Sequence, residues 1–182
     1  MSKIIVLPYN LDWANQFLEL KNIIWPKVLG VALSIEHVGS TSVPGLAAKP
    51  IIDIDIVIPD MSFLPKIIDG LATIGYEHRG NLGIQDRESF KSKQSLIKNN
   101  LYVCPKDSVA LRNHICLRDT LRSDPQLRDE YALLKQELAL KFAESIDEYI
   151  EGKTDFILKI LKKNGLSSDR LEEIRKMNQA PI

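Results

Sequence analysis

The sequence is short of cysteine and has no long apolar run. Cys104 and Cys116 are the two cysteines of the 182 residues, and the eleven residues between them match neither a metal knuckle nor a redox pair. This excludes a disulfide scaffold and predicts two free thiols in a reducing compartment. No stretch is apolar enough to span a membrane, and the run Ile4 to Leu7 is too brief for a signal-peptide core. We therefore expect a cytoplasmic protein with no membrane partner.

An excess of charge of either sign is also absent. The 24 basic and 24 acidic residues give a formal net charge of zero, so no overall field draws the chain to nucleic acid or to an anionic membrane. Basic arrays with interleaved aromatic residues, which are typical of proteins that bind long nucleic acids, are missing. The composition favours a small-molecule or nucleotide ligand held in a local pocket. It gives no indication of the oligomeric state.

The pattern of apolar residues predicts an α/β (α+β) fold in a single domain over residues 1–182. Hydrophobic residues make up 45% of the chain, which is enough for one core. Near residue 105 the pattern changes from short strand-like runs to long helical periodicity, so we expect a sheet-containing core over 1–105 and a helical part over 106–182. The predicted strands cover 32–38, 51–58 and 96–104 with a hairpin over 76–93, and the predicted helices cover 13–25, 61–74, 107–122, 125–142, 147–163 and 168–178.

The strand over 51–58 carries the most informative pair of polar residues. Its even-numbered isoleucines lie on one face, while Asp53 and Asp55 project from the other, with α-carbons roughly 6.5 Å apart. Two ionised carboxylates side by side repel each other unless a cation lies between them. Mg²⁺ is commonly held by one or two carboxylates together with substrate phosphates. Asp53 and Asp55 are thus the predicted metal ligands and catalytic residues; the alternative is a solvated sheet face without a ligand.

A turn of small residues precedes this strand. Gly39 allows close approach of a ligand, and exposed backbone amides together with the Ser40 hydroxyl can hold phosphate oxygens. Thr41 continues the turn and Lys49 adds a positive charge nearby. These four residues are the main predicted phosphate-binding or nucleotide-binding residues.

Three further residues have weaker arguments. Arg87 and Lys91 would reach a phosphate if the hairpin over 76–93 folds over the site, although exposed basic residues in a polar loop are usually only solvated. We include both among the predicted phosphate-binding residues. The alternation of the strand places His37 on the same face as Ile35, which favours a packed or supporting histidine over a catalytic one.

The joint spacing of the turn and the acidic pair resembles the signature of the nucleotidyltransferase superfamily that includes DNA polymerase β. The stretch over 36–54, EHVGSTSVPGLAAKPIIDI, resembles more narrowly the GrpB family, whose members belong to that superfamily and have no characterised reaction. The similarity extends to Gly83, to residues 87–91 and 114–119, and to Glu151-Gly152-Lys153. It implies a nucleotidyltransferase-like mixed sheet flanked by helices, with a helical C-terminal part.

One departure from the superfamily pattern bears on activity. Superfamily enzymes usually place a third carboxylate on a neighbouring strand, and the residues here are Asn100 and Tyr102, which are poor metal ligands and poor bases near neutral pH. The leading hypothesis is a Mg²⁺-dependent nucleotide-binding or phosphate-binding protein that, if active, transfers a nucleotidyl group to a small molecule. The alternative is a catalytically silent protein that serves as a ligand sensor or protein-interaction module. A nucleotidyltransferase of a toxin–antitoxin pair ranks third.

Overall fold

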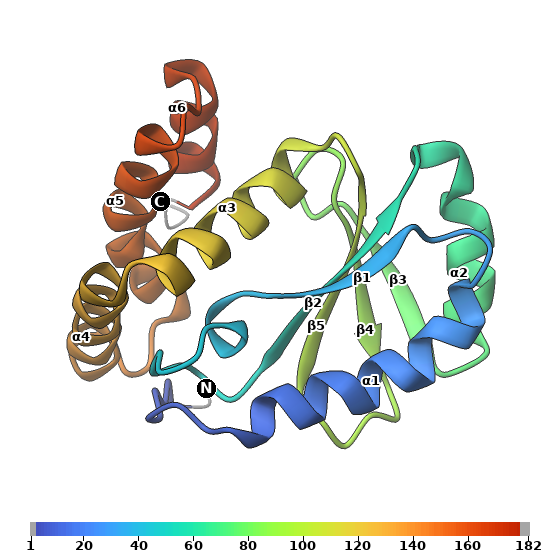
Figure 1. Cartoon of the computed structure of the whole chain (residues 1–182), viewed down its shortest axis with the longest axis horizontal. Coiled ribbons are helices and arrows are strands. Elements are labelled where there is room, and N and C mark those ends of the chain that lie inside the picture. Colours follow the sequence, from blue (N-terminus) through green and yellow to red (C-terminus); the bar gives the residue numbers. More distant parts are fainter. Residues whose placement is uncertain (1–2, 179–182) are drawn as a thin grey trace.

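A five-stranded mixed sheet forms the centre of the structure, a computed structural model that describes residues 3–178 (Figure 1). The strand order is β1-β2-β5-β4-β3; β2 and β5 run parallel, and the other neighbouring pairs are antiparallel. Helices flank both faces, which confirms the predicted fold class. The strands are β1 (Ser34–Val38), β2 (Ile52–Ile58), β3 (Tyr76–Gly80), β4 (Glu88–Ser92) and β5 (Asn99–Pro105).

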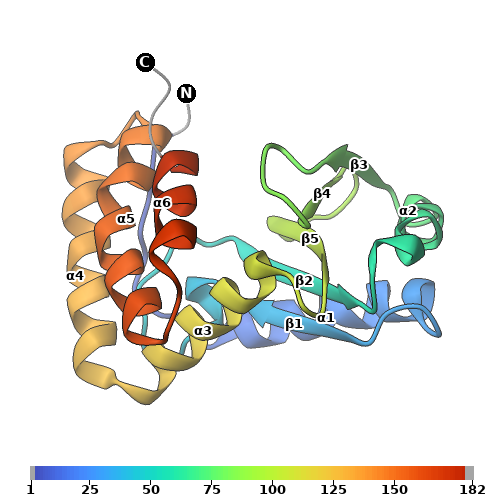
Figure 2. The ribbon, with the colours of Figure 1, turned by 90° about the horizontal axis from the view of Figure 1, so that it is seen from above.

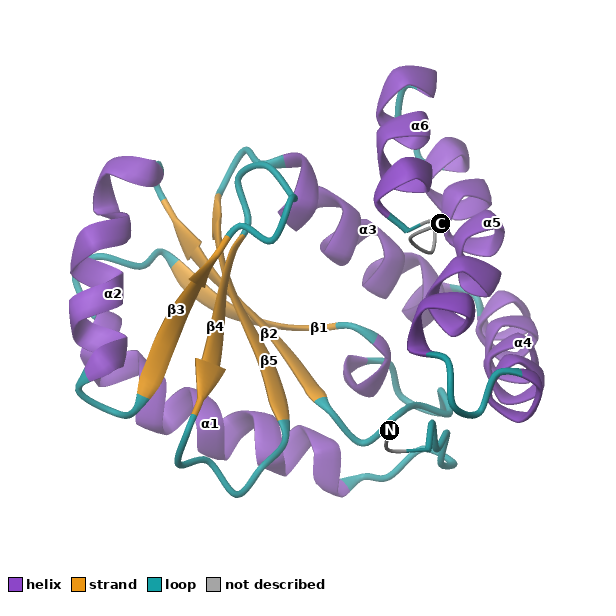
Figure 3. Ribbon diagram, turned by 180° about the vertical axis from the view of Figure 1, so that it is seen from behind, coloured by secondary structure: helices purple, strands orange, loops and turns teal. Residues whose placement is uncertain are grey.

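Two helices, α1 (Asp12–Val28) and α2 (Leu64–Ala72), cover one face of the sheet (Figure 3). The alternation in β2 directs its four even-numbered isoleucines toward them, and all four are fully buried. Such burial of aliphatic side chains stabilises the fold by roughly 1.5–3 kcal/mol for each residue. The largest cluster of buried residues thus lies between β2 and these helices, and includes Trp13, Leu20, Ile24, Val28, Ile67 and Leu71.

The opposite face of the sheet is crossed by α3 (Val109–Ser123), and this face carries the polar residues of β2. Ala110 and Leu111 of α3 pack against Val57 and Cys104 at one end of the strands. Burial raises the pKa of the Cys104 thiol, as expected for an unreactive core cysteine. The buried apolar contact between α3 and the strands therefore lies at one end of the sheet. The rest of this face of the sheet is available for a site.

Three further helices gather beside the sheet: α4 (Pro125–Lys141), α5 (Ile146–Lys163) and α6 (Ser168–Met177), as Figure 2 shows. The side chains of Asp124 and Ser145 cap α4 and α5 by accepting hydrogen bonds from the backbone amides of Leu127 and Glu148. Pro125 takes the first helical position of α4. In the described part of the chain, none of the helices is long and apolar enough to cross a membrane.

Some predicted element boundaries were wrong by two or three residues. We expected Pro26 to end the first helix, but α1 continues to Val28. Proline disfavours a helix interior, and the full burial of Ile24 and Val28 in the core offsets that cost. The strand predicted from residue 96 begins at Asn99, since Leu96 is fully exposed. The first turn of the helix predicted over 61–74 is the short 3₁₀ helix η2 (Met61–Phe63).

Candidate functional site

Gly39 and Asp53 are in direct contact at the end of β1. The antiparallel register pairs Val38 with Asp53, so the chain leaves β1 beside the acidic residue and enters the 3₁₀ helix η1 (Ser40–Ser42). Gly39 has φ of 67° and ψ of −172°, a conformation that is essentially confined to glycine. A Cβ atom at this position would overlap the Asp53 carboxylate. The turn therefore needs glycine both for its backbone conformation and for the close approach of Asp53.

The second acidic residue of β2 is completely buried. Asp55 has 0% exposure, and its Oδ2 accepts a hydrogen bond of 2.7 Å from Nδ1 of His114 on α3. Burial disfavours the charged imidazole, but the Asp55 carboxylate outweighs this effect and raises the pKa of His114. Among the described residues, Asp55 Oδ1 is buried without a hydrogen-bond partner. A buried acceptor of this kind is suited to a cation or to a donor from a ligand.

Asp53 is half-buried and is held by the neighbouring strand. Its Oδ1 accepts a 2.8 Å hydrogen bond from Nδ2 of Asn100. Burial raises the pKa of Asp53, while the bond from Asn100 and the charge of His114 oppose this shift. The parallel register sets Asn100 beside Asp53 and Tyr102 beside Asp55, so the strand next to β2 supplies an amide and a phenol.

The residues present fit a divalent cation that is bound with help from its substrate. In residues 3–178, no group of three or more histidine, cysteine, aspartate or glutamate side chains is arranged to hold a metal. Two carboxylates on one strand face, with the orphaned oxygen of Asp55, are a donor set that suits Mg²⁺ completed by phosphate oxygens and water. Asp53 and Asp55 are the residues that would hold it.

A basic cavity of about 180 Å³ opens beside Asp53, and we name it the lysine pocket. Lysine residues reach it from three separate parts of the chain, and the Gly39–Ser40 turn forms one wall. No salt bridge joins any of these lysines to a carboxylate in the described part of the chain. The lysine pocket is lined by Ser40, Thr41, Lys49, Ile51, Asp53, Asn100, Lys135, Tyr149, Ile150 and Lys153.

Lys135 of α4 is the most deeply placed of these lysines, with 2% exposure. Its Nζ lies 2.9 Å from Ser40 Oγ and also donates to the carbonyl of Ala47, and it lies 4.7 Å from the centre of the Tyr131 ring. Burial, reinforced by the charge of Lys153, lowers the pKa of Lys135 to about 7. A buried ammonium group without a counterion is unfavourable, so an anion in the pocket would stabilise its charged form.

The other two lysines approach the ring of Tyr149. Lys153 Nζ lies 4.6 Å and Lys49 Nζ 5.6 Å from the ring centre. Burial, with the charge of Lys49, lowers the pKa of Lys153 to about 8; burial also lowers the pKa of Lys49, against the attraction of Asp53. A Cβ at Gly152 would clash with Leu138, so glycine lets α5 pack closely on α4 and bring Lys153 to the pocket. The pocket therefore concentrates positive charge around a tyrosine ring.

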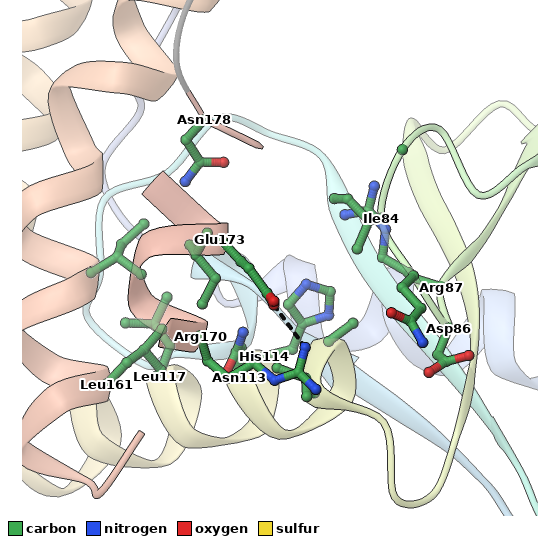
Figure 4. A pocket seen from close by; sticks show the side chains of 16 residues that line it. Ile84, Asp86, Arg87, Asn113, His114, Leu117, Leu161, Arg170, Glu173 and Asn178 are labelled. Atoms are coloured by element: carbon green, nitrogen blue, oxygen red, sulfur yellow. Dashed lines mark hydrogen bonds and ion pairs between the residues drawn. The ribbon is translucent and has the colours of Figure 1, made fainter. Parts of the chain in front are cut away.

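A second and larger cavity of about 490 Å³ lies between the β3–β4 loop, α3, α5 and α6, and we name it the α6 cavity (Figure 4). Its floor includes His114, the partner of Asp55. Arg87 extends into it from the loop, with its guanidinium carbon 4.4 Å from the centre of the Tyr102 ring. The two cavities therefore adjoin the two acidic residues separately, the lysine pocket at Asp53 and the α6 cavity at Asp55 through His114.

The structure divides the predicted phosphate-binding residues between different places. Ser40, Thr41 and Lys49 line the lysine pocket with Asp53, and Gly39 lies directly beneath that carboxylate. Arg87 and Lys91 lie apart from these residues, so a role for either in binding phosphate stays a prediction. Arg87 lines the α6 cavity. Lys91 is exposed in β4, opposite Glu77 in the register of β3 and β4, and lines neither cavity.

Thr41 and His37 support the turn through contacts within the protein. The Thr41 hydroxyl lies 3.0 Å from Nε2 of His37 and donates to the carbonyl of Ile51. The His37 ring stacks on Phe17 at 4.5 Å with an interplanar angle of 8°. Burial, with the charges of Arg122 and Arg118, lowers the pKa of His37 to about 4. His37 is therefore a neutral, packed histidine that supports the turn.

Sequence reasoning missed three residues of the site: Lys135, Lys153 and His114. A signal for each existed in the helical periodicity, since each interrupts an apolar face. Lys135 follows Tyr131 by four residues in the stripe that was interpreted as helix packing, and Lys153 follows Tyr149 by four in the next helix. A charged residue at a position that the pattern assigns to the core requires a buried partner or a ligand.

Comparisons with known proteins agree with this fold. The family described as GrpB protein matches residues 3–163. The UPF0157 protein YqkA of Bacillus subtilis is 33% identical over 159 residues, which cover 85% of this chain; the chain spans 45% of the length of that relative. The crystal structure of the conserved protein GrpB from Enterococcus faecalis is 32% identical, with a TM-score of 0.78 over 94% of this chain and 98% of that chain.

A more distant structural likeness concerns the fold alone. The crystal structure of the Cid1 poly(U) polymerase is 12% identical, with a TM-score of 0.50 over 71% of this chain and 41% of that chain. The chain thus has a nucleotidyltransferase-like fold, as its resemblance to that superfamily implied.

Proposed function

Because the chain belongs to the GrpB family and its lysine pocket joins the Ser40 turn to Asp53, we propose that it binds a nucleoside triphosphate with Mg²⁺. The observation that carries the proposal is the convergence of Lys49, Lys135 and Lys153, which have no carboxylate partner among residues 3–178, beside an acidic pair with an orphaned oxygen. A triphosphate with Mg²⁺ supplies negative charge for the lysines and a cation for the carboxylates at once.

The same arrangement suits nucleotidyl transfer to a hydroxyl group of a small molecule. The acceptor oxygen would form a bond to the α-phosphorus while the bond from that phosphorus to the bridging oxygen of the β-phosphate breaks. Pyrophosphate would leave on the side of the lysine pocket, and the hydroxyl proton would pass to solvent. Asp53 and Asp55 would hold Mg²⁺, which neutralises charge on the transferred group when it is bound.

Isothermal titration of the four ribonucleoside triphosphates, with and without Mg²⁺, tests the binding. We expect Mg²⁺-dependent binding that is lost in Asp53→Asn and weakened at least tenfold in Lys135→Met, since a buried charge-assisted contact contributes about 1.5–3 kcal/mol. Lys141→Met is the matched control, because Lys141 is an exposed lysine at the end of the same helix. Absence of binding for every triphosphate, in protein shown to be folded, would contradict the proposal.

One observation favours a second function, that of a binding protein without turnover. Asn100 takes the register position beside Asp53 and donates to it, so a third carboxylate is missing where superfamily enzymes usually have one. A silent member would bind Mg²⁺ and triphosphate but release no pyrophosphate with any acceptor. Release of pyrophosphate by the wild-type protein supports an enzyme. Its absence, together with its appearance in Asn100→Asp, supports a silent protein that has lost the third carboxylate.

A further inference from the structure

The α6 cavity combines an aliphatic wall with two polar groups that have no partner. Within the described residues, Arg87 Nε and Asn113 Oδ1 are buried and make no hydrogen bond, and both side chains line this cavity. Arg87 Nε is a donor on a charged guanidinium group. The Asn113 amide presents an acceptor to the cavity, or a donor if its oxygen and nitrogen exchange places. Buried polar groups are nearly always satisfied in folded proteins, so these two atoms are open to a partner that enters the cavity, and a polar ligand would satisfy both.

The charge of Arg87 also lacks a protein counterpart. Its guanidinium stacks on Tyr102 and takes part in no salt bridge within residues 3–178. The other arginine of the cavity, Arg170, is already paired with Glu173 at 2.7 Å, as Figure 4 shows. Figure 4 also shows Asp86 on the far side of the cavity from α6, with its carboxylate directed away from that helix. Arg87 is thus the cation that remains for an oxyanion of the ligand.

The rest of the cavity wall indicates the shape of the ligand. Its apolar side chains are aliphatic, and the described residues that line it include no phenylalanine, tyrosine or tryptophan; the one aromatic ring among them is the imidazole of His114. A nucleobase is normally held by stacking on aromatic rings, and the His114 imidazole is already held by its hydrogen bond to Asp55. The volume of about 490 Å³ is within the range of pockets for small organic molecules. The aliphatic residues are Ile84, Val109, Ala110, Leu117, Ile157, Leu161 and Ile174.

We propose that the α6 cavity binds a small aliphatic molecule that carries an oxyanion, with Arg87 on the anion and Asn113 on a neighbouring polar group. This inference rests on the proposed function in one respect, namely that the molecule is the acceptor. In an in-line transfer the attacking and leaving oxygens lie on opposite sides of phosphorus. If pyrophosphate leaves at Asp53 into the lysine pocket, the acceptor approaches from the Asp55 side, where His114 forms the floor of the α6 cavity.

Ligand-observed NMR on the full chain tests the binding directly. The probes are leucate, isohexyl phosphate, isohexanol and adenosine, which present an aliphatic carboxylate, an aliphatic phosphate, the same body without charge, and a nucleoside. We expect leucate or isohexyl phosphate to bind and isohexanol to bind on the order of thirtyfold more weakly, because a charge-assisted contact to Arg87 is lost. Whichever of the two anions binds more tightly identifies the oxyanion as carboxylate or phosphate.

Variants assign the binding to the α6 cavity. Arg87→Met should abolish anion binding and Arg87→Lys should retain part of it, while Arg79→Met, an exposed arginine of the same hairpin, should leave it unchanged. The proposal is overturned if neither anion binds, if Arg87→Met binds them as the wild type does, or if adenosine binds in an Arg87-dependent way. A cooperative urea unfolding transition like that of the wild type shows that Arg87→Met is folded.

The same samples distinguish failure of this inference from failure of the proposed function. Lys135→Met should bind triphosphate at least tenfold more weakly and keep anion binding at the α6 cavity. If no variant and no wild-type sample binds triphosphate, but leucate or isohexyl phosphate still binds through Arg87, the proposed function fails and the α6 cavity stands as a ligand site. If triphosphate binds and neither anion does, the α6 cavity proposal fails and the proposed function stands.

Discussion

Lys135→Met should stabilise the ligand-free protein while it weakens triphosphate binding. Lys135 is 2% exposed, and burial lowers its pKa from 10.5 to about 7. That difference corresponds to about 5 kcal/mol of unfavourable free energy for keeping the ammonium charged in the fold. Methionine has a similar length and fills the same space without a charge, and hydrophobic replacement of buried charges is often stabilising.

The net gain in stability is smaller than the full electrostatic term. The substitution also removes the hydrogen bonds from Lys135 to Ser40 Oγ and to the Ala47 carbonyl, a loss of about 1–3 kcal/mol. We therefore expect the free energy of unfolding at pH 7 to rise by about 2 kcal/mol, which for a chain of this size raises the Tm by about 5 °C. Urea unfolding and calorimetry of wild type and variant measure both quantities, with Lys141→Met as the control.

The pH dependence provides a signature of this mechanism. Since the folded pKa of Lys135 lies below its unfolded value, the unfolded chain binds more protons between about pH 7 and 10.5, and wild-type stability gains from this group as the pH rises through that window. The advantage of Lys135→Met should therefore be largest at or below pH 7 and shrink toward pH 10. A destabilised variant, or an advantage that does not shrink with pH, would refute the reasoning.

Two further predictions concern the turn. Gly39→Ala should lower the free energy of unfolding by about 2–3 kcal/mol and abolish Mg²⁺-dependent triphosphate binding, because its Cβ would displace Asp53. The control Gly80→Ala, also at positive φ but in open space, should lower the free energy of unfolding by about 1 kcal/mol and leave binding intact. Equal effects of the two substitutions in urea unfolding and titration calorimetry would count against the argument. Folding lowers the pKa of His37 from 6.5 to about 4, so the unfolded chain takes up the proton first as the pH falls. The protein should therefore lose about 2 kcal/mol of stability between pH 6.5 and 4. In His37→Gln the free energy of unfolding, measured with urea, should depend less on pH over this range, and an unchanged pH dependence would argue against this assignment.

Local chain geometry accounts for what could be predicted from the sequence. A strand directs every second side chain to the same face, so the spacing of Asp53 and Asp55 was enough to predict that both leave β2 on the side away from its buried isoleucines. Helical periodicity likewise predicted each helix, with an error at the end of α1, where Pro26 was expected to stop it. The start of β5 was placed too early because Leu96 was taken as part of the strand. Gly39 could be predicted to form a turn, because few other residues tolerate its conformation.

The tertiary structure decided which distant residues join the acidic pair. Lys135 and Lys153 lie on helices whose packing, at Gly152 against Leu138, depends on contacts between elements far apart in the chain, and no local pattern specifies that contact. The hairpin loop in turn carries Arg87 to the α6 cavity and away from the lysine pocket. The sequence alone therefore determined the faces and the turn, since these follow from the backbone geometry of neighbouring residues. Only the folded structure determined the two cavities, since each is formed where separate elements pack together.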